Sequence, residues 1–360
     1  MKAWVLRGIN ELTLENVSMP QPGEQEAVVA VKAVGICGSD IPRIYRTGAH
    51  THPLIPGHEF SGEVVKVGKG ADRTWLGQRV GIFPLIPCRA CDPCRKKQYE
   101  MCRNYSYLGS RRDGGFAEYA VVPVWNLLPL SEKVSLEAAA MMEPMAVAVH
   151  AMRQMMPDLS LIRAGSHPET TAVCGLGTIG LLLLMFLKEA GFENVYAIGN
   201  KEIQKKTALE LGVKEEDYCD SRMQDPYTWL TERTDGAGTD RFFECVGKNE
   251  TCTLAVKSSA PGGNVTLVGN PYSDMVLEKE IYWKILRNQI TVTGTWNSSF
   301  IHEPEDDWSY VLGRLAEGRI SPEKLISHRF SLENLEEGLH IMRDKTSEYV
   351  KIMGRAGIEM

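Results

Sequence analysis

The chain has 360 residues, of which 43% are hydrophobic and 24% charged, and 40 lysines and arginines against 46 aspartates and glutamates give it a net charge of −6. These proportions are typical of a globular protein and exclude disordered, collagen-like and coiled-coil chains. The mild acidity disfavours nucleic acid and anionic membranes as partners, because both are bound through basic surfaces. At about 150 residues per domain, the length predicts two domains.

The N-terminal segment, MKAWVLRGINELTLE, has neither the sustained apolar run nor the small-residue cleavage site of a secretion signal. The longest apolar stretch, residues 176–187, is interrupted by Gly177, Thr178 and Gly180. It is also shorter than the ~20 residues that a membrane-spanning helix needs. We therefore expect a cytoplasmic protein with no membrane segment.

The first third of the chain predicts a β-rich domain. Residues 27–34 are mostly apolar, and residues 62–67 alternate between the two faces of a strand. Segments rich in proline and glycine lie at 20–23 and 53–57. Short strands separated by such turns are typical of a barrel or a sandwich.

Four of the nine cysteines lie within one fifteen-residue segment with the spacing C-x2-C-x2-C-x7-C: Cys88, Cys91, Cys94 and Cys102. Thiols this close together in a reducing compartment indicate a metal site rather than disulfides. Four thiolates leave a zinc ion no open coordination position, so we expect a structural zinc. Disulfides and an iron–sulfur cluster are the alternatives, although the bacterial ferredoxin pattern closes with a three-residue gap.

The middle third alternates between short apolar strands and helices. The predicted strands are 170–174, 194–198, 241–245, 264–268 and 289–295, and the predicted helices are 181–190, 203–211 and 251–259. Strands that alternate with helices form βαβ units and a parallel sheet. The remaining residues return to mixed helix and strand.

A glycine-rich turn joins the first of these strands to the first helix. Gly175, Gly177 and Gly180 form the pattern G-x-G-x-x-G, with Thr178 and Ile179 inside it. Between a strand and a helix, the first glycine allows a tight turn, the second lets a pyrophosphate approach the backbone, and the third allows close packing. The helix N-terminus adds amide donors. We therefore expect a dinucleotide cofactor here; the alternative is that the glycines only form a tight turn.

The end of the next predicted strand favours NADP over NAD. NAD sites usually carry an acidic residue there for the ribose 2′-hydroxyl, but this chain has Gly199, Asn200 and Lys201. A small residue leaves room for a 2′-phosphate, which Lys201 and a lysine of the following helix would neutralise. The alternative is that these lysines form a solvated face and that Glu202 takes the acidic role.

Four motifs occur together along the chain: G-I-C-G-S-D at 35–40, P-G-H-E-F-S-G at 56–62, the four cysteines, and G-L-G-T-I-G at 175–180. In order and spacing they resemble the zinc-dependent medium-chain dehydrogenase/reductase family over nearly the whole chain. The resemblance implies an α/β protein with a GroES-like β-rich catalytic domain and a Rossmann domain that has a doubly wound parallel sheet. It also implies an active site between the domains and a homodimer or homotetramer.

The catalytic domain implied by this resemblance is built from both ends of the chain, residues 1–148 and 297–360. It carries the structural zinc lobe at 88–102. The Rossmann domain, residues 149–296, is inserted between the two parts.

Within the family the chain resembles the sorbitol dehydrogenase branch. The segments that carry this resemblance are 37–44, 48–53, 109–119 and 284–296. The branch implies hydride transfer between a secondary alcohol of a polyol or polyol phosphate and NAD(P), which gives a ketose or ketose phosphate. The alternatives are a dehydrogenase of an unphosphorylated polyol or of threonine, and a zinc-stabilised nucleotide-binding protein without turnover.

The resemblance also implies a second, catalytic zinc held by Cys37, His58 and Glu143, so that each chain binds two zinc ions. Glu59 is implied either as a fourth ligand or as a carboxylate that exchanges with substrate or water. The zinc would act as a Lewis acid on the alcohol, and Ser39 would take the alcohol proton.

The chain departs from many relatives in the next step of this proton relay. They carry a histidine five residues after the cysteine ligand, where this chain has Pro42. His50, the cofactor ribose and water are the candidates for the outer relay group.

A phosphorylated substrate needs cationic side chains, and arginines suit a phosphate best because they bind it in a bidentate manner. The candidates are Arg43, Arg111, Arg112 and Lys284. For the arginines the alternative is ion pairing with Asp40 or Asp113. We interpret Asp40 as a structural residue that orients the loop around Cys37.

Overall fold

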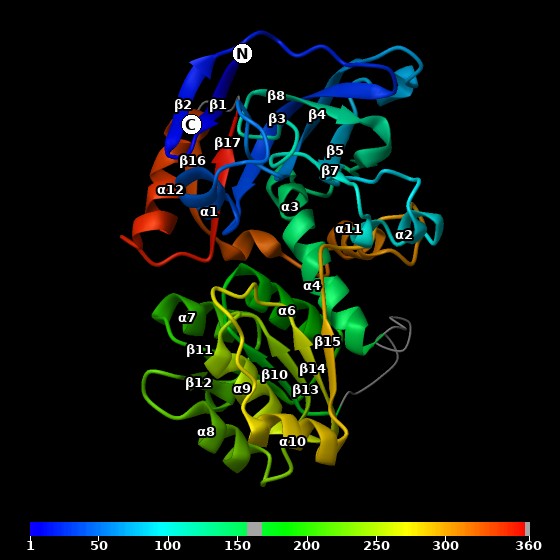
Figure 1. Cartoon of the computed structure of the whole chain (residues 1–360). Helices are drawn as coiled ribbons and strands as arrows, with labels where there is room; N and C mark the ends of the chain where they lie inside the picture. Colours follow the sequence, from blue (N-terminus) through cyan, green and yellow to red (C-terminus); the bar gives the residue numbers. More distant parts are fainter. Residues whose placement is uncertain (157–167, 357–360) are drawn as a thin grey trace. The chain divides into compact units, whose positions relative to one another are not determined.

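The computed structural model describes residues 1–156 and 168–356, and the chain divides into two compact units (Figure 1). The first unit is formed by Met1–Pro144 and Ser299–Met360, and the second by Met145–Ser298. The first contains a largely antiparallel sheet, and the second a parallel sheet. The predicted combination of a β-rich domain and a doubly wound domain is confirmed.

The main sheet of the first unit contains strands from both ends of the chain. Its strands follow in the order β16 (Ile326–Ser331), β17 (Lys351–Arg355), β3 (Glu26–Ile36), β4 (Glu59–Val67), β5 (Arg79–Ile82) and β9 (Leu127–Pro129), and β8 (Tyr119–Pro123) also pairs with β3. Strand β17 runs antiparallel to β3, with Ile352 opposite Ile36. The last strand of the chain therefore lies beside the end of β3, which Cys37 follows.

Smaller elements complete the first unit. The remaining strands are β1 (Lys2–Gly8) and β2 (Glu11–Asn16), which form a hairpin, and β6 (Leu85–Ile86) and β7 (Ser106–Tyr107), which pair with each other. The helices are α1 (Asp40–Pro42), η1 (Arg43–Thr47), η2 (Arg73–Trp75), α2 (Asp92–Arg95), η3 (Tyr99–Met101), η4 (Val124–Asn126), α3 (Leu136–Ala140), the start of α4 (Met142–Met155), α11 (Asp307–Ala316), η6 (Pro322–Leu325), η7 (Leu332–Asn334) and α12 (Leu335–Asp344).

The core of the first unit explains why β3 does not alternate. Nine of its eleven residues are buried, because both faces of this central strand are covered. The core cluster brings together side chains that are far apart in sequence, among them Trp4, Phe60, Phe116 and Leu339. Burial of apolar surface, rather than local propensity, therefore joins the N-terminal and C-terminal parts of this unit.

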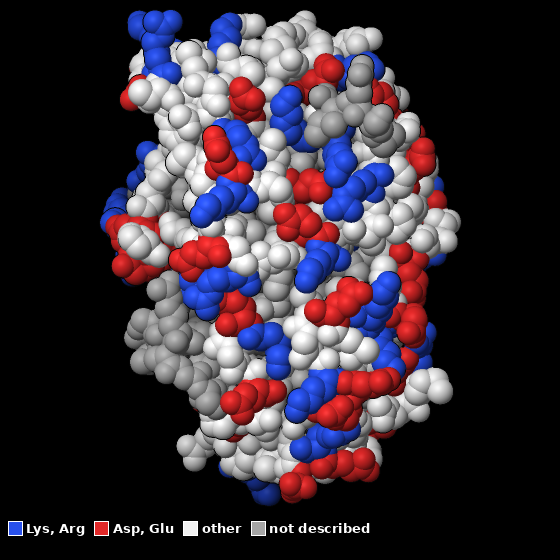
Figure 2. Space-filling view, turned by 180° about the vertical axis from the view of Figure 1, so that it is seen from behind, with Lys and Arg blue, Asp and Glu red and all other residues white. Residues whose placement is uncertain are grey.

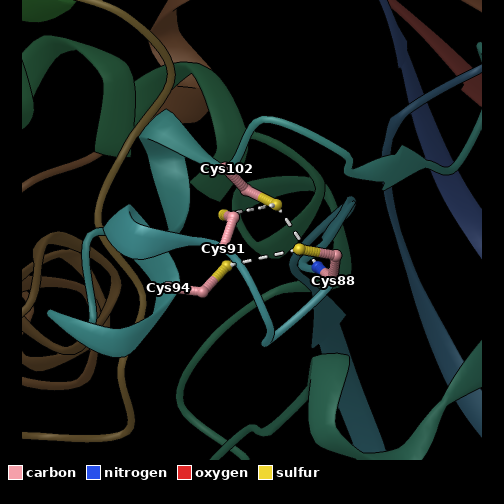
Figure 3. Close-up of side chains that lie close together, drawn as sticks. All are labelled: Cys88, Cys91, Cys94 and Cys102. Atoms are coloured by element: carbon pink, nitrogen blue, oxygen red, sulfur yellow. Dashed lines mark hydrogen bonds between the residues drawn. The ribbon is translucent and has the colours of Figure 1, made fainter.

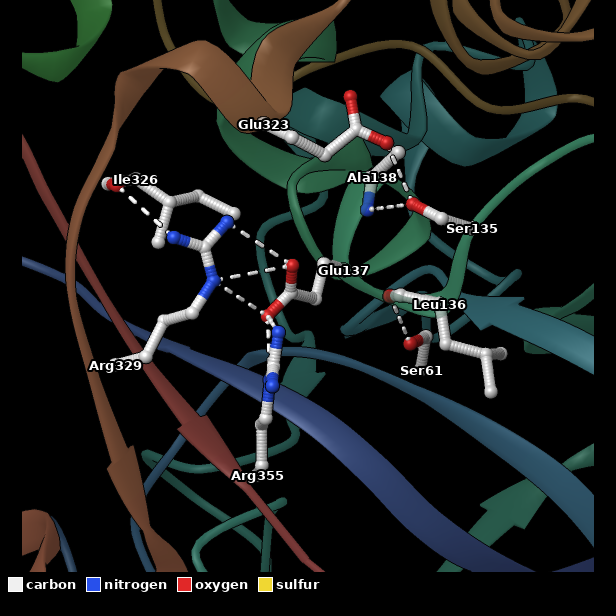
Figure 4. A network of polar contacts seen from close by, with 9 residues as sticks. All are labelled: Ser61, Ser135, Leu136, Glu137, Ala138, Glu323, Ile326, Arg329 and Arg355. Atoms are coloured by element: carbon white, nitrogen blue, oxygen red, sulfur yellow. Dashed lines mark hydrogen bonds and ion pairs between the residues drawn. The ribbon is translucent and has the colours of Figure 1, made fainter. Parts of the chain in front are cut away.

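One carboxylate fixes helix α3 to the two C-terminal strands (Figure 4). Glu137 accepts a hydrogen bond from Arg355 Nε at 2.7 Å and another from Arg329 Nε at 3.0 Å. Burial acts to raise the pKa of Glu137, but the two arginines outweigh it and lower the pKa. Ser135 caps the helix by accepting the Ala138 amide at 3.0 Å. Because α4 follows directly after α3, these contacts also fix the start of α4.

The second unit is built on a six-stranded parallel sheet. Its strands follow in the order β12 (Tyr218–Asp220), β11 (Val195–Gly199), β10 (Thr171–Cys174), β13 (Thr239–Glu244), β14 (Ser259–Leu267) and β15 (Thr291–Gly294), and its helices are the rest of α4, α6 (Thr178–Glu189), α7 (Glu202–Glu210), η5 (Glu215–Asp217), α8 (Pro226–Arg233), α9 (Asn249–Ser258) and α10 (Lys279–Asn288). After β10 the chain continues on one side with β11 and later returns to the other side with β13. Ligands of such sheets bind at the carboxyl ends of the strands at this switch point.

Helix α6 begins three residues earlier than the sequence pattern predicts, at Thr178 instead of 181. The physical reason is that Gly177 is its N-cap, so Gly180 already lies in the first turn. Residues 181–184 are all buried, and the helix is apolar on every face because it belongs to the core of its unit.

None of the helices in the described residues is long and apolar enough to cross a membrane. On the face shown in Figure 2, positive and negative side chains are interspersed. This face therefore presents no extended basic surface of the kind that binds nucleic acid.

Candidate active site

The pairing of β3 with β4 brings the first candidate metal ligands together. Gly35 near the end of β3 lies opposite Glu59 at the start of β4. Cys37 follows β3, and His58 precedes β4, so the two residues lie at the same end of this strand pair. Antiparallel register thus joins two motifs that are about twenty positions apart in the sequence.

Cys37, His58 and Glu59 each offer a ligand atom, and these atoms all lie within 4.8 Å of one another. His58 and Glu59 are buried, with exposed fractions of 4% and 1%. His58 Nδ1 faces the buried Asp40 carboxylate, 3.5 Å from its Oδ1. A thiol, an imidazole and a carboxylate are the donors that zinc prefers. The three side chains therefore fit a zinc ion.

Asp40 orients the loop that carries Cys37. Its buried carboxylate accepts the Cys37 amide at 3.0 Å and Arg43 Nη1 at 2.6 Å, and it lies 3.5 Å from His58 Nδ1. Burial acts to raise the pKa of Asp40, but the charges of His58 and Arg43 lower it. Burial likewise acts to lower the pKa of His58, and the charges of Asp40 and Cys37 raise it well above its usual value. The anionic surroundings of this imidazole are those that a bound cation would neutralise.

Glu143 lies in the first turn of α4 and is buried, but it is outside the group of atoms within 4.8 Å. Its Oε1 accepts a hydrogen bond from the Tyr107 hydroxyl at 3.0 Å. Burial raises the pKa of Glu143, and the nearby charge of Glu59 adds to this effect, while the charge of His58 opposes it. The ligand role of Glu143 therefore stays a prediction.

Lys351 at the start of β17 is a site residue that the sequence reasoning missed. It is 1% exposed, donates to the Ile36 carbonyl at 3.0 Å and forms an ion pair with Glu59. A Cβ on Gly35 would lie 2.2 Å from Glu59 Oε2, so the absence of a side chain there makes room for the pair. The available sequence signal was a lysine between the apolar residues Val350 and Ile352, at the start of a strand.

Ser39, the first relay candidate, lies next to the cluster. Its hydroxyl donates to Cys37 Sγ at 3.4 Å and does not cap the helix that follows. His50 lies exposed in the loop after η1. Pro42 ends the short helix α1.

The candidate phosphate-binding cations differ in their surroundings. Arg43 is paired with Asp40, and Arg112 Nη2 lies 2.5 Å from Glu26 Oε1. Arg111 is exposed, and its guanidinium lies over the Tyr105 ring, 4.5 Å from the centroid. In the second unit, Lys284 of α10 donates to the Lys257 carbonyl. Asp113, the other alternative ion-pair partner, accepts the Ile55 amide at 2.9 Å.

The four-cysteine lobe forms a closed group of sulfur atoms (Figure 3). Cys88, Cys91, Cys94 and Cys102 lie within ligand distance of one another. The contacts between Cys88 and Cys94 at 4.0 Å and between Cys91 and Cys102 at 3.9 Å are far longer than a disulfide bond of ~2.05 Å. All four are therefore free thiols, and the disulfide alternative is excluded.

The electrostatics of this lobe fit a cation. Amide donors of Arg103 and Cys94 lower the pKa of Cys91 to about 6, whereas burial and the neighbouring thiols raise the pKa of Cys94 to about 12. Without a metal, the surroundings thus favour the thiolate of Cys91 and disfavour that of Cys94. A zinc ion would stabilise all four thiolates together.

We expect Cys88→Ala to release one zinc ion and to lower the melting temperature, by about 2–4 °C for each kcal/mol lost in a domain of this size. Metal content by mass spectrometry and calorimetry measure the two effects. Cys252→Ala is the matched control, because Cys252 is a half-buried thiol in the second unit outside both clusters. An unchanged zinc content in Cys88→Ala would contradict the assignment.

The glycine turn of the second unit has the geometry of a phosphate cradle. Gly175 has a φ of 93°, and a Cβ there would lie 2.4 Å from Val246. A Cβ on Gly180 would lie 2.1 Å from the Gly175 carbonyl oxygen, so helix and turn approach closely. Gly177 faces open space, and no side chain caps the helix it begins. The amides of Thr178 and Ile179 at this helix N-terminus therefore fit a pyrophosphate.

At the end of β11, a side chain at position 199 would meet the side chains of its neighbours. A Cβ on Gly199 would lie 2.6 Å from the Tyr218 hydroxyl. The Asn200 amide donates to Gln204 Oε1 at 3.0 Å, which fixes the turn before α7. Lys201 is the N-cap of α7, and Lys205 of the same helix is paired with Glu215 at 2.8 Å. Both lysines therefore lie near the start of the helix that follows β11.

Two family descriptions match the chain. Residues 23–132 match the "alcohol dehydrogenase GroES-like domain", and residues 178–317 match the "zinc-binding dehydrogenase" family. Galactitol 1-phosphate 5-dehydrogenase of Escherichia coli K12 is 34% identical over 316 residues, which cover 88% of each chain. L-threonine 3-dehydrogenase of Bacillus licheniformis is 31% identical and covers 95% of this chain and 96% of its own.

Solved structures agree with these matches. The galactitol-1-phosphate dehydrogenase of Escherichia coli has a TM-score of 0.88 at 32% identity and covers 99% of this chain and 100% of its own. A zinc-binding dehydrogenase of Sinorhizobium meliloti bound to NADP has a TM-score of 0.87 at 26% identity and covers 98% of both chains. An Escherichia coli alcohol dehydrogenase complexed with NADH has a TM-score of 0.86 at 26% identity and covers 99% of both.

Proposed function

The chain belongs to the zinc-dependent medium-chain dehydrogenase/reductase family of NAD(P)-dependent alcohol dehydrogenases, and from this premise we propose that it oxidises a polyol phosphate of the galactitol 1-phosphate kind to a ketose phosphate. The observation that carries the proposal is the group of Cys37, which is half-buried, with the buried His58 and Glu59, and with the Ser39 hydroxyl beside it. Zinc bound there would act as a Lewis acid on the substrate hydroxyl, and nicotinamide would accept the hydride.

We assign the binding of zinc and the transfer of the proton to the following residues of the chain. Cys37, His58 and Glu143 would hold the catalytic zinc, and Glu59 beside Lys351 would be the carboxylate that exchanges with substrate or water. Ser39 accepts the proton that the alcohol releases, since its hydroxyl lies next to a ligand sulfur. His50 passes the proton on, and its exposure allows exchange with the solvent. With the structural zinc of the lobe, each chain holds two zinc ions.

A series of ring contacts supports Arg111 as a ligand of the substrate phosphate. The His58 and Tyr107 rings lie 5.8 Å apart, the Tyr107 and Tyr105 rings 6.1 Å apart, and the Arg111 guanidinium lies over Tyr105. Arg111 is thus connected to the metal cluster and is exposed, whereas Arg43 and Arg112 are paired with carboxylates. An arginine without a carboxylate partner can bind a phosphate in a bidentate manner.

NADP is the favoured cofactor in this proposal. Position 199 is a glycine instead of the acidic residue that an NAD site usually carries, and the Tyr218 hydroxyl would lie 2.6 Å from a Cβ there. Lys201 at the start of α7 supplies a positive charge for the 2′-phosphate. NADP is bound in the Sinorhizobium meliloti relative, and NADH in one from Escherichia coli.

A panel of polyols and polyol phosphates with both cofactors tests the proposal through the absorbance of the reduced nicotinamide. We expect turnover of a hexitol phosphate with NADP, and Arg111→Ala should reduce its kcat/KM relative to the free polyol by about 10- to 100-fold. Arg7→Ala on the N-terminal hairpin is the control, because this exposed arginine pairs with Glu15. If threonine or an unphosphorylated polyol is the best substrate, the polyol phosphate assignment is wrong. A strong preference for NAD would contradict the proposed NADP preference.

We also propose a cytoplasmic homodimer or homotetramer. All nine cysteines are free thiols, which fits a reducing compartment. Large apolar side chains are exposed between 272 and 296, among them Tyr272, Val276 and Trp296 at 83%, 67% and 55%. The edge strand β15 lies in this segment, and unpaired edge strands with apolar neighbours favour association with a second copy.

A further inference from the structure

Tyr107 contacts two of the residues assigned to the catalytic metal. Its hydroxyl donates to Glu143 Oε1 at 3.0 Å, and its ring meets the His58 ring edge-on at 5.8 Å and 62°. We propose that Tyr107 is a positioning residue that holds Glu143 for the catalytic zinc and connects this site to the four-cysteine lobe. The inference rests on the proposed function, because it takes Glu143 as a zinc ligand.

The position of Tyr107 in the fold supplies the connection. Strands β6 and β7 pair with Leu85 opposite Tyr107, and the lobe at 88–102 is the segment that joins these two strands. Two paired residues on each side are too few to hold a hairpin on their own. The Leu108 amide also donates to the Pro84 carbonyl at 3.0 Å, and a metal that closes the lobe would further restrain β7 and with it the Tyr107 hydroxyl.

The hydrogen bond from Tyr107 to Glu143 also stabilises one of two buried carboxylates at this site. Glu59 and Glu143 are both buried carboxylates, with exposed fractions of 1% and 9%. Each has its own donor: Lys351 for Glu59 and Tyr107 for Glu143. A donor on Oε1 stabilises the Glu143 carboxylate and leaves Oε2 for a metal. Donors behind metal ligands commonly change metal affinity by about 10- to 100-fold.

Tyr107→Phe tests the inference, because it removes only the hydroxyl and keeps the ring against His58. We expect the variant to bind the catalytic zinc about 10- to 100-fold more weakly than the wild type, so that a chelator removes this ion more readily. The four-cysteine lobe should keep its zinc, and the melting temperature should change little. Tyr119→Phe is the matched control, since Tyr119 is a half-buried tyrosine of β8 in the same unit. Equal zinc retention in wild type and Tyr107→Phe would overturn the inference.

A double-mutant cycle separates positioning from general packing. If Tyr107 acts through Glu143, then Tyr107→Phe has no further effect on zinc retention in a Glu143→Gln background. Additive losses, or joint loss of both zinc ions with a lower melting temperature, would overturn the inference. Zinc retention is measured without turnover, so a wild type that is inactive on every polyol would count against the proposed function and not against Tyr107.

Discussion

His58→Gln is expected to lower kcat/KM by at least about 10³-fold, because it removes a ligand of the catalytic zinc. The zinc content should fall from two ions per chain to one, with the lobe still filled. The imidazole is buried with its Nδ1 3.5 Å from Asp40 Oδ1, in the group formed with Cys37 and Glu59. A glutamine of similar size keeps the space filled, so the loss would report on the metal and not on a cavity.

The measurements are steady-state kinetics and zinc content by mass spectrometry on the same preparation. His340→Gln is the control, because His340 lies on α12 near Glu336, outside the cluster. It should retain both zinc ions and wild-type turnover. A His58→Gln enzyme with two zinc ions and more than a tenth of the activity would refute the assignment of this centre.

Lys351→Met is expected to destabilise the first unit by about 3–5 kcal/mol, because it leaves the buried Glu59 carboxylate without its cation. The Ile36 carbonyl also loses its donor. Methionine fills the space of the lysine stem, so packing changes little. Chemical denaturation followed by circular dichroism measures the loss.

A double variant that removes both charges of the pair serves as the internal control. Lys351→Met combined with Glu59→Leu removes both charges, and we expect it to recover most of the lost stability while the enzyme stays impaired. Lys324→Met, at an exposed lysine, should change stability by no more than about 0.5 kcal/mol. If the single variant is as stable as the wild type, or the double variant as unstable as the single one, the buried pair does not have this role.

Residues that act through their near neighbours in sequence could be recognised from the sequence. Cys88 to Cys102 meet because the whole group lies within fifteen residues, and the glycines of 175–180 share one turn between β10 and α6. Short segments have few conformations, so spacing and residue type indicate the chemistry. The alternation of strands and helices likewise predicted the parallel sheet of the second unit.

Cys37, His58 and Glu143 were accessible only through the family resemblance. Their spacing carries no local geometry, and the structure brings Cys37 and His58 together through the register of β3 and β4. The structure also separates the candidate cations by their partners: Arg43 and Arg112 have carboxylates beside them, and Arg111 has an aromatic ring. No sequence pattern distinguishes these arginines.

The sequence by itself predicted the four-cysteine lobe and the glycine turn, because each depends on residues within one short segment, and its periodicity predicted the two kinds of domain. Only the tertiary structure decided that Lys351 pairs with Glu59 and that Tyr107 binds Glu143. Lys351 reaches the site because β17 pairs with β3 across more than three hundred residues of chain. Pairing over such distances is set by burial and strand register, which depend on the whole core and not on the residues that meet.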